Sequence, residues 1–414
     1  MSIERSDLPS GLKVVTERVP GARSASFGVW VRVGSRDEPS HLAGVSHFLE
    51  HLLFKGTRTR SGREISEMIE AVGGELNAHT SHEHTAFYTR VPAEAAALGL
   101  DLLVDVVTSP AFDGADVESE RQVITEELHQ SEDEGADRVM SLAHEILWGG
   151  HPLGREVLGT EETISSMSRD ALAAFFDDHY HPDNLVVVAA GAVEHRQVVD
   201  AVSRLEPRPG HERPVRSEPR ALGSPGGPTV LRRQLEQAHL AVVWPGLAVG
   251  DPDRYALAVA NQILGGGLSS RLFQTIREER GLVYTVFSAV AAYSDAGSVV
   301  AYAGTSPDRV SQVRKLIADE VARAIDGGTT VREWEVARGY LRGASLLGSE
   351  DPGSVMGRLG SQMCARGSVG PLERQLARLD AVTVDDVDRV LRRVLGAEPL
   401  VVGVGSVEAS DLVG

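Results

Sequence analysis

Two histidines and a glutamate near residue 50 have the types and spacing that metal chemistry requires. His47 and His51 are four residues apart, so on a helix their imidazoles share one face, with Glu50 beside them. Two neutral imidazoles and a carboxylate from elsewhere would bind zinc and leave one position for water, whose proton Glu50 could accept. The order His-x-x-Glu-His is the inverted form of a known zinc signature. The open alternative is a histidine pair that lies on a solvated helix face or has its hydrogen bonds satisfied within the protein.

The segment around this motif has the pattern of an amphipathic helix. Its apolar residues recur at i, i+3, i+4, i+7 and i+8, which places them on a stripe that packs on a core. These residues are Val45, Phe48, Leu49, Leu52 and Leu53. The polar residues of the motif therefore occupy a different face.

A third ligand must come from another element, and the helical segment 118–130 is the best candidate. Glu127 lies on its apolar stripe and could ligate a metal. Glu120, two turns earlier, could hydrogen-bond a ligand imidazole and fix its tautomer. Glu126 is rotated about 100° from Glu127 on a helix and ranks lower. Solvated glutamates are common on helices, so spacing alone leaves this assignment open.

Composition and charge narrow the class of protein. The chain has 414 residues, 42% apolar and 24% charged, which is typical of a globular protein with two to three domains. The single Cys364 excludes an intramolecular disulfide framework and a cysteine-ligated zinc site. A net charge of -18 argues against nucleic acid as a partner. We see no transmembrane segment and no leader peptide, and therefore expect a cytoplasmic enzyme that does not bind membranes.

The order of expected elements is the same in the two halves of the chain. The first half reads as strands and helices that end on the strand 185–192, and the second half repeats the series from 238–244 to 400–405. A helix is expected from Ser269 to Gly281 in this second series. We interpret the pattern as an internal duplication. It predicts an α+β fold of two homologous halves, each a mostly antiparallel sheet packed against a layer of helices.

A segment rich in Pro, Gly and charged residues separates the halves and lacks an apolar period, which indicates an exposed linker. The predicted boundaries are an N-terminal zinc-binding repeat at 1–207, the linker at 208–228, and a C-terminal repeat at 229–414. The second repeat has no histidine in its first helix. Only the first repeat could therefore hold the metal.

Several motifs, in order, resemble the pitrilysin and insulinase family of zinc peptidases. They are His47-Phe48-Leu49-Glu50-His51 followed by Glu127, then Gly73-Gly74-Glu75-Leu76-Asn77-Ala78, and Leu264-Gly265-Gly266-Gly267-Leu268-Ser269-Ser270-Arg271-Leu272. The resemblance covers nearly the whole chain and is closest to half-length bacterial members similar to the mitochondrial processing peptidase β subunit. It implies zinc ligation by His47, His51 and Glu127, a general base at Glu50, and a supporting carboxylate at Glu120.

The resemblance also implies substrate contacts in both halves. Arg277 and Tyr284 match residues that stabilise the oxyanion, although spacing alone would favour a surface ion pair and a core tyrosine. Asn77 and Ala78 lie in the expected strand 76–80, whose edge could pair with an extended peptide. The implied activity is a zinc endopeptidase, with one zinc per chain, that cleaves unfolded and possibly basic peptides or presequence-like segments inside an enclosed chamber.

The number of repeats implies how such a chamber would be completed. Longer relatives carry four repeats as two facing bowls, so this chain would form half of a clamshell and we expect a homodimer. Arg277 and Tyr284 facing one zinc would then come from the partner chain. Two alternatives are a non-catalytic or hetero-oligomeric scaffold or binding subunit of the same fold, and a metal-dependent hydrolase of non-peptide bonds. The intact set of ligands and base disfavours the scaffold, and the strand for an extended substrate disfavours the second hydrolase.

Overall fold

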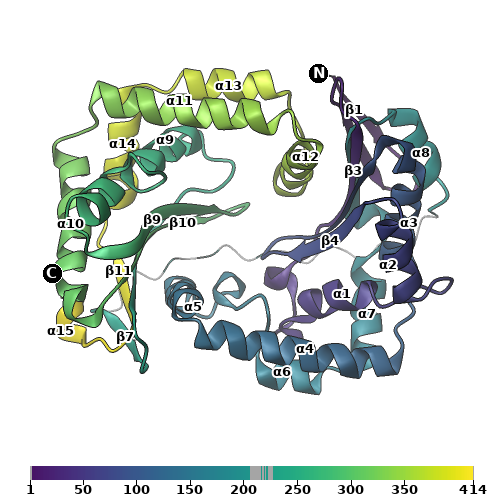
Figure 1. Ribbon diagram of the computed structural model, residues 1–414, viewed down its shortest axis with the longest axis horizontal. Coiled ribbons are helices and arrows are strands. Elements are labelled where there is room, and N and C mark those ends of the chain that lie inside the picture. Colours follow the sequence, from purple (N-terminus) through teal and green to yellow (C-terminus); the bar gives the residue numbers. More distant parts are fainter. Residues whose placement is uncertain (1, 206–215, 217–218, 220, 222–226, 414) are drawn as a thin grey trace. The chain divides into compact units, whose positions relative to one another are not determined.

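The computed structural model describes residues 2–205, 216, 219, 221 and 227–413, so most of the predicted linker lies outside the described residues. The chain divides into two compact units, each built around one sheet (Figure 1). Unit 1 comprises Met1–Leu128, Arg155–Arg216 and Ser345–Leu372. Unit 2 comprises His129–Gly154, Ser217–Ala344 and Glu373–Gly414. Within the described residues, no helix is both long enough and apolar enough to cross a membrane.

Unit 1 contains a six-stranded sheet in the order β1-β2-β6-β3-β5-β4. The parallel pair is β2 with β6, and the other neighbours are antiparallel. Strand β4 lies at an edge and pairs only with β5 among the described residues. The strands are β1 (Ile3–Asp7), β2 (Lys13–Arg18), β3 (Ser24–Val31), β4 (Glu75–Thr80), β5 (Thr85–Pro92) and β6 (Leu185–Gly191).

Unit 2 contains a five-stranded sheet in the order β7-β11-β8-β10-β9, again with a single parallel pair, β7 with β11. This order matches β2-β6-β3-β5-β4 strand by strand. The predicted α+β fold of two similar halves with mostly antiparallel sheets is therefore confirmed, although the sequence pattern missed β1 and β7. The strands are β7 (Thr229–Arg232), β8 (Ala238–Pro245), β9 (Val283–Ala292), β10 (Gly297–Thr305) and β11 (Leu400–Gly405).

Helices from the first half of the sequence cover one face of the first sheet. Figure 1 shows α2, α3 and α8 on this side, and the core between the layers contains Phe27, Val29, Phe48 and Leu103, all almost completely buried. The helices of this half that belong to unit 1 are α1 (Val45–Leu53), α2 (Gly62–Glu70), α3 (Ala96–Thr108), most of α4 (Gly114–Asp133), α6 (Glu161–Ser166), α7 (Arg169–His179) and α8 (His195–Val202).

The other face of the first sheet is covered by α12 (Pro352–Arg366), a helix from the second half of the sequence. Its residues Val355 and Leu359 join a buried cluster with Trp30 and Val188 of the sheet. Gly360 lies so close to the Trp30 ring that a Cβ at this position would overlap the indole. The first sheet is thus buried on both faces, which explains why every residue of β6 is buried.

The second sheet is covered in the same reciprocal way. Val139 and Leu147 of α5 (Gly135–Trp148), from the first half of the sequence, pack on Val243 and Val402. The opposite face is covered mainly by α9 (Arg254–Leu264), α10 (Val310–Asp326) and α14 (Val384–Leu395). The remaining helices are α11 (Val331–Gly348), α13 (Leu372–Asp380) and α15 (Ala409–Leu412).

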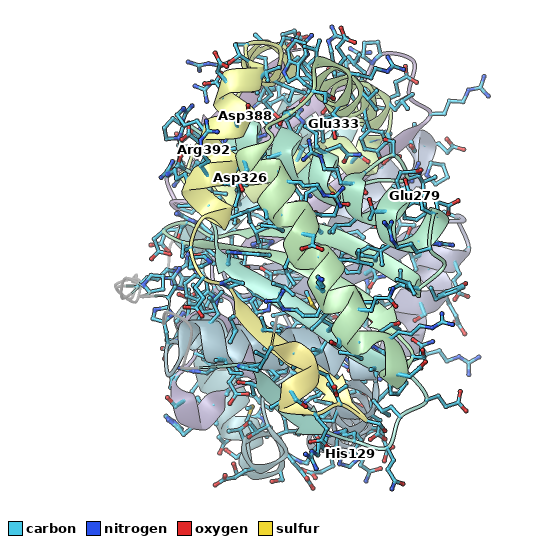
Figure 2. All side chains as sticks on the ribbon, turned by 90° about the vertical axis from the view of Figure 1, so that its left-hand side faces the viewer. His129, Glu279, Asp326, Glu333, Asp388 and Arg392 are labelled. Carbon is cyan, nitrogen blue, oxygen red and sulfur yellow. The ribbon has the colours of Figure 1, made fainter. Side chains whose placement is uncertain are left out.

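Three hydrogen bonds connect the loop after α10 to α11 and α14 in unit 2. Asp388 of α14 accepts a hydrogen bond of 2.8 Å from the backbone nitrogen of Thr329, in the loop between α10 and α11. Glu333, in the first turn of α11, accepts hydrogen bonds from both the backbone nitrogen and the hydroxyl of Thr330. Figure 2 labels Asp388 and Glu333, together with Asp326 at the end of α10. The loop after α10 is therefore held by a carboxylate from α14 and a carboxylate from α11.

The compact units do not coincide with the predicted ranges 1–207 and 229–414, because α5 and α12 each pack in the unit formed mainly by the other half of the chain. That the first repeat binds zinc and the second is inactive stays a prediction.

Candidate metal centre

Helix α1 is fixed at its start by the buried side chain of Glu38. The Glu38 carboxylate accepts hydrogen bonds from the backbone nitrogens of Gly44, at 2.7 Å, and Ser46, at 2.8 Å. These N–H groups have no partner within the helix, and the helix dipole favours a negative charge there. Gly44 has φ +91°, a conformation that glycine adopts without strain. The sequence pattern missed this contribution of Glu38.

The three predicted metal ligands lie together. Glu127 Oε2 is 3.6 Å from His47 Nε2 and 3.5 Å from His51 Nε2, and one ligand atom from each residue falls within 4.8 Å of the other two. Zinc bonds of roughly 2.0–2.1 Å in a tetrahedron separate ligand atoms by about 3.3 Å. The arrangement therefore fits a zinc ion. In the described part of the chain, this is the one group of three or more such side chains placed to hold a metal, and Glu126 is not in it.

The protonation state of His47 also suits a ligand. Burial, and secondarily the neighbouring His51, lowers the pKa of His47 to about 4. The imidazole is thus neutral at pH 7, which is the form that binds metal. Its Nδ1 atom is buried and has no hydrogen-bond partner among the described residues.

Glu120 contacts His51 at Nδ1, the ring nitrogen that does not face Glu127. Its Oε2 lies 3.0 Å from His51 Nδ1, and its side chain is only 4% exposed. A proton on Nδ1 leaves His51 Nε2 as the free lone pair on the side of Glu127. The second oxygen of Glu120 forms an ion pair with Lys55 Nζ at 2.5 Å. Lys55, four residues after His51 and just beyond the end of α1, was not identified from the sequence.

Glu50 lies beside the cluster without belonging to it. Its Oε2 accepts a hydrogen bond of 2.6 Å from the hydroxyl of Thr80, at the end of β4. Burial raises the pKa of Glu50, and the Thr80 hydrogen bond and the charge of His51 partly oppose this rise. The predicted base is thus held by a residue that the sequence pattern did not single out.

The two predicted substrate-contact residues lie on the exposed edge strand. Helix α1 and β4 are neighbours (Figure 1). Ala78 is turned to the core, whereas the Asn77 side chain is on the opposite face and accepts a hydrogen bond of 2.8 Å from the Ala78 nitrogen. Because β4 has no second strand neighbour among the described residues, its outer edge could receive an extended peptide.

Arg277 and Tyr284 are neighbours in unit 2. Arg277 lies on η6 (Phe273–Glu278), a π-helix within the expected helix from Ser269 to Gly281. Its guanidinium carbon is 4.8 Å from the centre of the Phe273 ring and 5.6 Å from that of Tyr284. Tyr284 is the second residue of β9 (Val283–Ala292), an edge strand of the second sheet, and is 77% exposed, so the alternative of a core tyrosine is wrong. The role of this pair stays a prediction.

Comparisons with known proteins agree with this architecture. The model of "Insulinase (Peptidase family M16)" matches residues 13–161, and that of "Peptidase M16 inactive domain" matches residues 166–341. An uncharacterized zinc protease of Streptomyces coelicolor is 42% identical over 405 residues, covering 96% of this chain and 88% of the relative. The uncharacterized zinc protease YmxG of Bacillus subtilis is 36% identical over 395 residues, covering 95% of each chain.

A solved structure shows the same fold. The crystal structure of a protease from Helicobacter pylori superimposes with a TM-score of 0.92, although it is only 21% identical, over 98% of this chain and 99% of that one. Together with matches to both family models and with relatives of similar length, these findings confirm the predicted resemblance: the chain belongs to peptidase family M16, the insulinase family, as a half-length bacterial member.

Proposed function

We propose that this protein is a zinc-dependent endopeptidase with its catalytic site on α1 and α4. The observation that carries the proposal is the cluster of His47, His51 and Glu127, with Glu50 held beside it. The spacing of the three ligand atoms suits zinc, and relatives with over 40% identity are named zinc proteases. One zinc per chain is expected.

Each side chain has a distinct task in this proposal. Zinc bound by the three ligands would supply Lewis acidity and lower the pKa of a water molecule towards about 7. Glu120 holds His51 in the tautomer that presents Nε2. Glu50 accepts a proton on Oε1, the oxygen not bonded to Thr80, and returns it to the leaving amine.

The substrate would be an extended peptide. Main-chain pairing along β4, near Asn77 and Ala78, selects unfolded segments rather than a particular sequence. The net charge of -18 favours basic peptides and presequence-like segments. Arg277 and Tyr284 would donate hydrogen bonds to the oxyanion, each worth about 3 to 4 kcal/mol when well placed. In a homodimer that encloses the substrate, the partner copy would supply this pair.

The alternative is a non-catalytic or hetero-oligomeric scaffold subunit. It is favoured by the match of residues 166–341 to a domain described as inactive. That match covers the half of the sequence without the ligand cluster, whereas His47, Glu50, His51 and Glu127 lie in the other match. A scaffold has no physical need for this arrangement, so we prefer the peptidase.

The test is cleavage of a quenched basic peptide by the wild type and by Glu50→Gln, with zinc content measured in both. We expect both proteins to hold zinc, and Glu50→Gln to lose roughly 10²- to 10⁴-fold in kcat, the usual contribution of a general base. A chelator should abolish wild-type cleavage and zinc should restore it. A wild type that holds zinc but cleaves no member of a peptide library would point to the hetero-oligomeric alternative. Absence of zinc from both proteins would contradict the metal site.

A further inference from the structure

The side chain of Thr80 links the edge strand of the first sheet to the helix that carries the proposed base. Along β4, side chains alternate between the two faces, so Thr80 follows Ala78 on the side of α1, whereas Asn77 and His79 are exposed on the other. The Thr80 hydroxyl is 2.6 Å from Glu50 Oε2. This distance is typical of a hydroxyl that donates to a charged carboxylate.

Thr80 is also the one hydrogen-bond partner of the Glu50 carboxylate in the described part of the chain. Its hydroxyl has a single proton to donate. The competing acceptor, the backbone oxygen of Ser46, is 3.5 Å away and is therefore the weaker choice. The backbone of Thr80 also hydrogen-bonds Glu50, but it affects the pKa of this carboxylate less than the hydroxyl does. The Thr80 hydroxyl is thus the main hydrogen bond that orients Glu50 Oε2.

We propose that Thr80 is a positioning residue that fixes Glu50 Oε2 and so directs Oε1 towards the attacking water. The proposal rests on the peptidase function inferred above. It has a consequence for substrate binding, because the strand whose outer edge would pair with the peptide is also the strand that orients the base. The peptide backbone would pair with β4, and the proton acceptor on α1 would be hydrogen-bonded to the same strand, which keeps their spacing constant.

The test compares Thr80→Val, which keeps the shape and strand preference but removes the donor, with Thr80→Ser, which keeps the donor. Thr89→Val is the matched control. The buried Thr89 hydroxyl, on β5, donates a hydrogen bond of 2.7 Å to the backbone oxygen of Glu75, which is at the other end of β4 from Thr80. We expect Thr80→Val to lower kcat by roughly 10- to 100-fold with KM changed less than about twofold. Thr80→Ser should restore most of kcat, and Thr89→Val should leave it unchanged.

Two further measurements separate positioning from a structural effect. Zinc content should be equal in all variants, and in the Glu50→Gln background the Thr80→Val change should have little additional effect, since the two residues act as a unit. An unchanged kcat in Thr80→Val, or a further loss in the double variant as large as in the single one, would overturn the proposal.

A structural readout keeps this inference distinct from the proposed function. Crystal structures of Thr80→Val and Thr80→Ser should show the Glu50 carboxylate displaced in the first and retained in the second. If Glu50 keeps its position in Thr80→Val, the positioning role is wrong even when the wild type is an active peptidase. If the wild type cleaves nothing, the peptidase proposal fails, and the displacement of Glu50 alone still decides whether Thr80 positions it.

Discussion

The buried carboxylate of Glu120 contacts both His51, a proposed zinc ligand, and Lys55. One oxygen binds His51 Nδ1 and the other pairs with Lys55. Replacement by glutamine removes the charge but keeps the size, so His51 loses its strongest orienting partner. We expect zinc affinity to fall roughly 10- to 100-fold, the usual cost of losing such a partner.

Competition with a chelator would measure this affinity, and Glu126→Gln on the same helix is the matched control. Glu126 is exposed and lies outside the ligand cluster, so its replacement should leave the affinity unchanged. Equal zinc affinities for Glu120→Gln and the wild type would show that the hydrogen bond to His51 does not contribute to zinc binding.

At the scale of residues, the sequence was informative where spacing within one helix determines geometry. His47 and His51 at i and i+4 share a face, and Glu120 and Glu127 at i and i+7 share another, so the pairing within each helix could be predicted. The choice of Glu127 and Glu120 to accompany the histidines was implied only by the family resemblance. Thr80 and Glu38 could not be assigned roles in this way, because their contacts with α1 depend on how separate elements pack. Thr80 entered the sequence analysis only as the last residue of the expected strand 76–80, and the pattern of a strand does not show which helix its side chains meet.

At the scale of elements, the start of α1 depends on a carboxylate with an unusual proton affinity. Burial raises the pKa of Glu38 from its ordinary 4.5 to about 6. The folded protein therefore holds this proton more tightly than the unfolded chain does. The resulting stabilisation is complete below pH 4.5 and is lost as the pH rises through 6.

Glu38→Gln should remove this pH dependence. Relative to the variant, the wild type should lose about 1.3 kcal/mol in free energy of unfolding between pH 4.5 and 6, out of about 2 kcal/mol over the whole titration. Urea unfolding at several pH values would measure the difference. Glu64→Gln is a suitable control, since hydrogen bonds with Ser61 lower the pKa of this exposed glutamate and its titration falls below the same window. A difference between wild type and Glu38→Gln that does not vary with pH would contradict the prediction.

The packing of α12 on the first sheet depends on a residue without a side chain. A methyl group at Gly360 would overlap the Trp30 ring, which is 1% exposed and cannot move into solvent. Gly360→Ala should therefore lower the free energy of unfolding by about 1 to 3 kcal/mol or more. In Gly357→Ala, three residues earlier, the added Cβ meets nothing within 4 Å, so helix propensity should make it neutral or stabilising by up to about 1 kcal/mol. Thermal unfolding of the two variants would test this contrast, and equal effects would show that the helix moves away from Trp30 at little cost.

The elements that the sequence missed have a physical explanation as well. Strand β1 has the sequence Ile-Glu-Arg-Ser-Asp, with three exposed residues of five, and among the strands that the structure describes it pairs only with β2. Strand β7 has four residues, none of them buried. Both lie at sheet edges, where little apolar surface is buried, so neither shows the apolar alternation by which the central strands were recognised.

At the scale of the whole molecule, the sequence predicted the duplication but not the exchange of helices between its copies. The apolar stripe of α12 shows that one face is buried, but it carries no information about which sheet covers it. The same holds for α5. In the structure, Met356, Leu359 and Met363 of α12 pack in the cluster of Trp30, whereas Ala143 and Leu147 of α5 pack in unit 2.

This exchange predicts that neither half of the sequence forms a stable domain by itself. A fragment of residues 1–207 would lack α12 and expose the apolar face formed by Val15, Trp30, Val186 and Val188, which are all buried in the full chain. An exposed apolar surface of this kind favours aggregation. We expect this fragment to lack cooperative unfolding and dispersed NMR signals when expressed alone.

Co-expression with residues 229–414 should restore a soluble complex, since that fragment supplies α12 and receives α5. Introducing Gly360→Ala into the second fragment should weaken the complex, and Gly357→Ala should not, because only the first substitution meets the Trp30 ring. Cooperative unfolding of fragment 1–207 alone would mean that the covering helix is dispensable for the first sheet. The two copies would then be independent domains that exchange helices without depending on them, and the boundaries read from the sequence would also be the boundaries of folding.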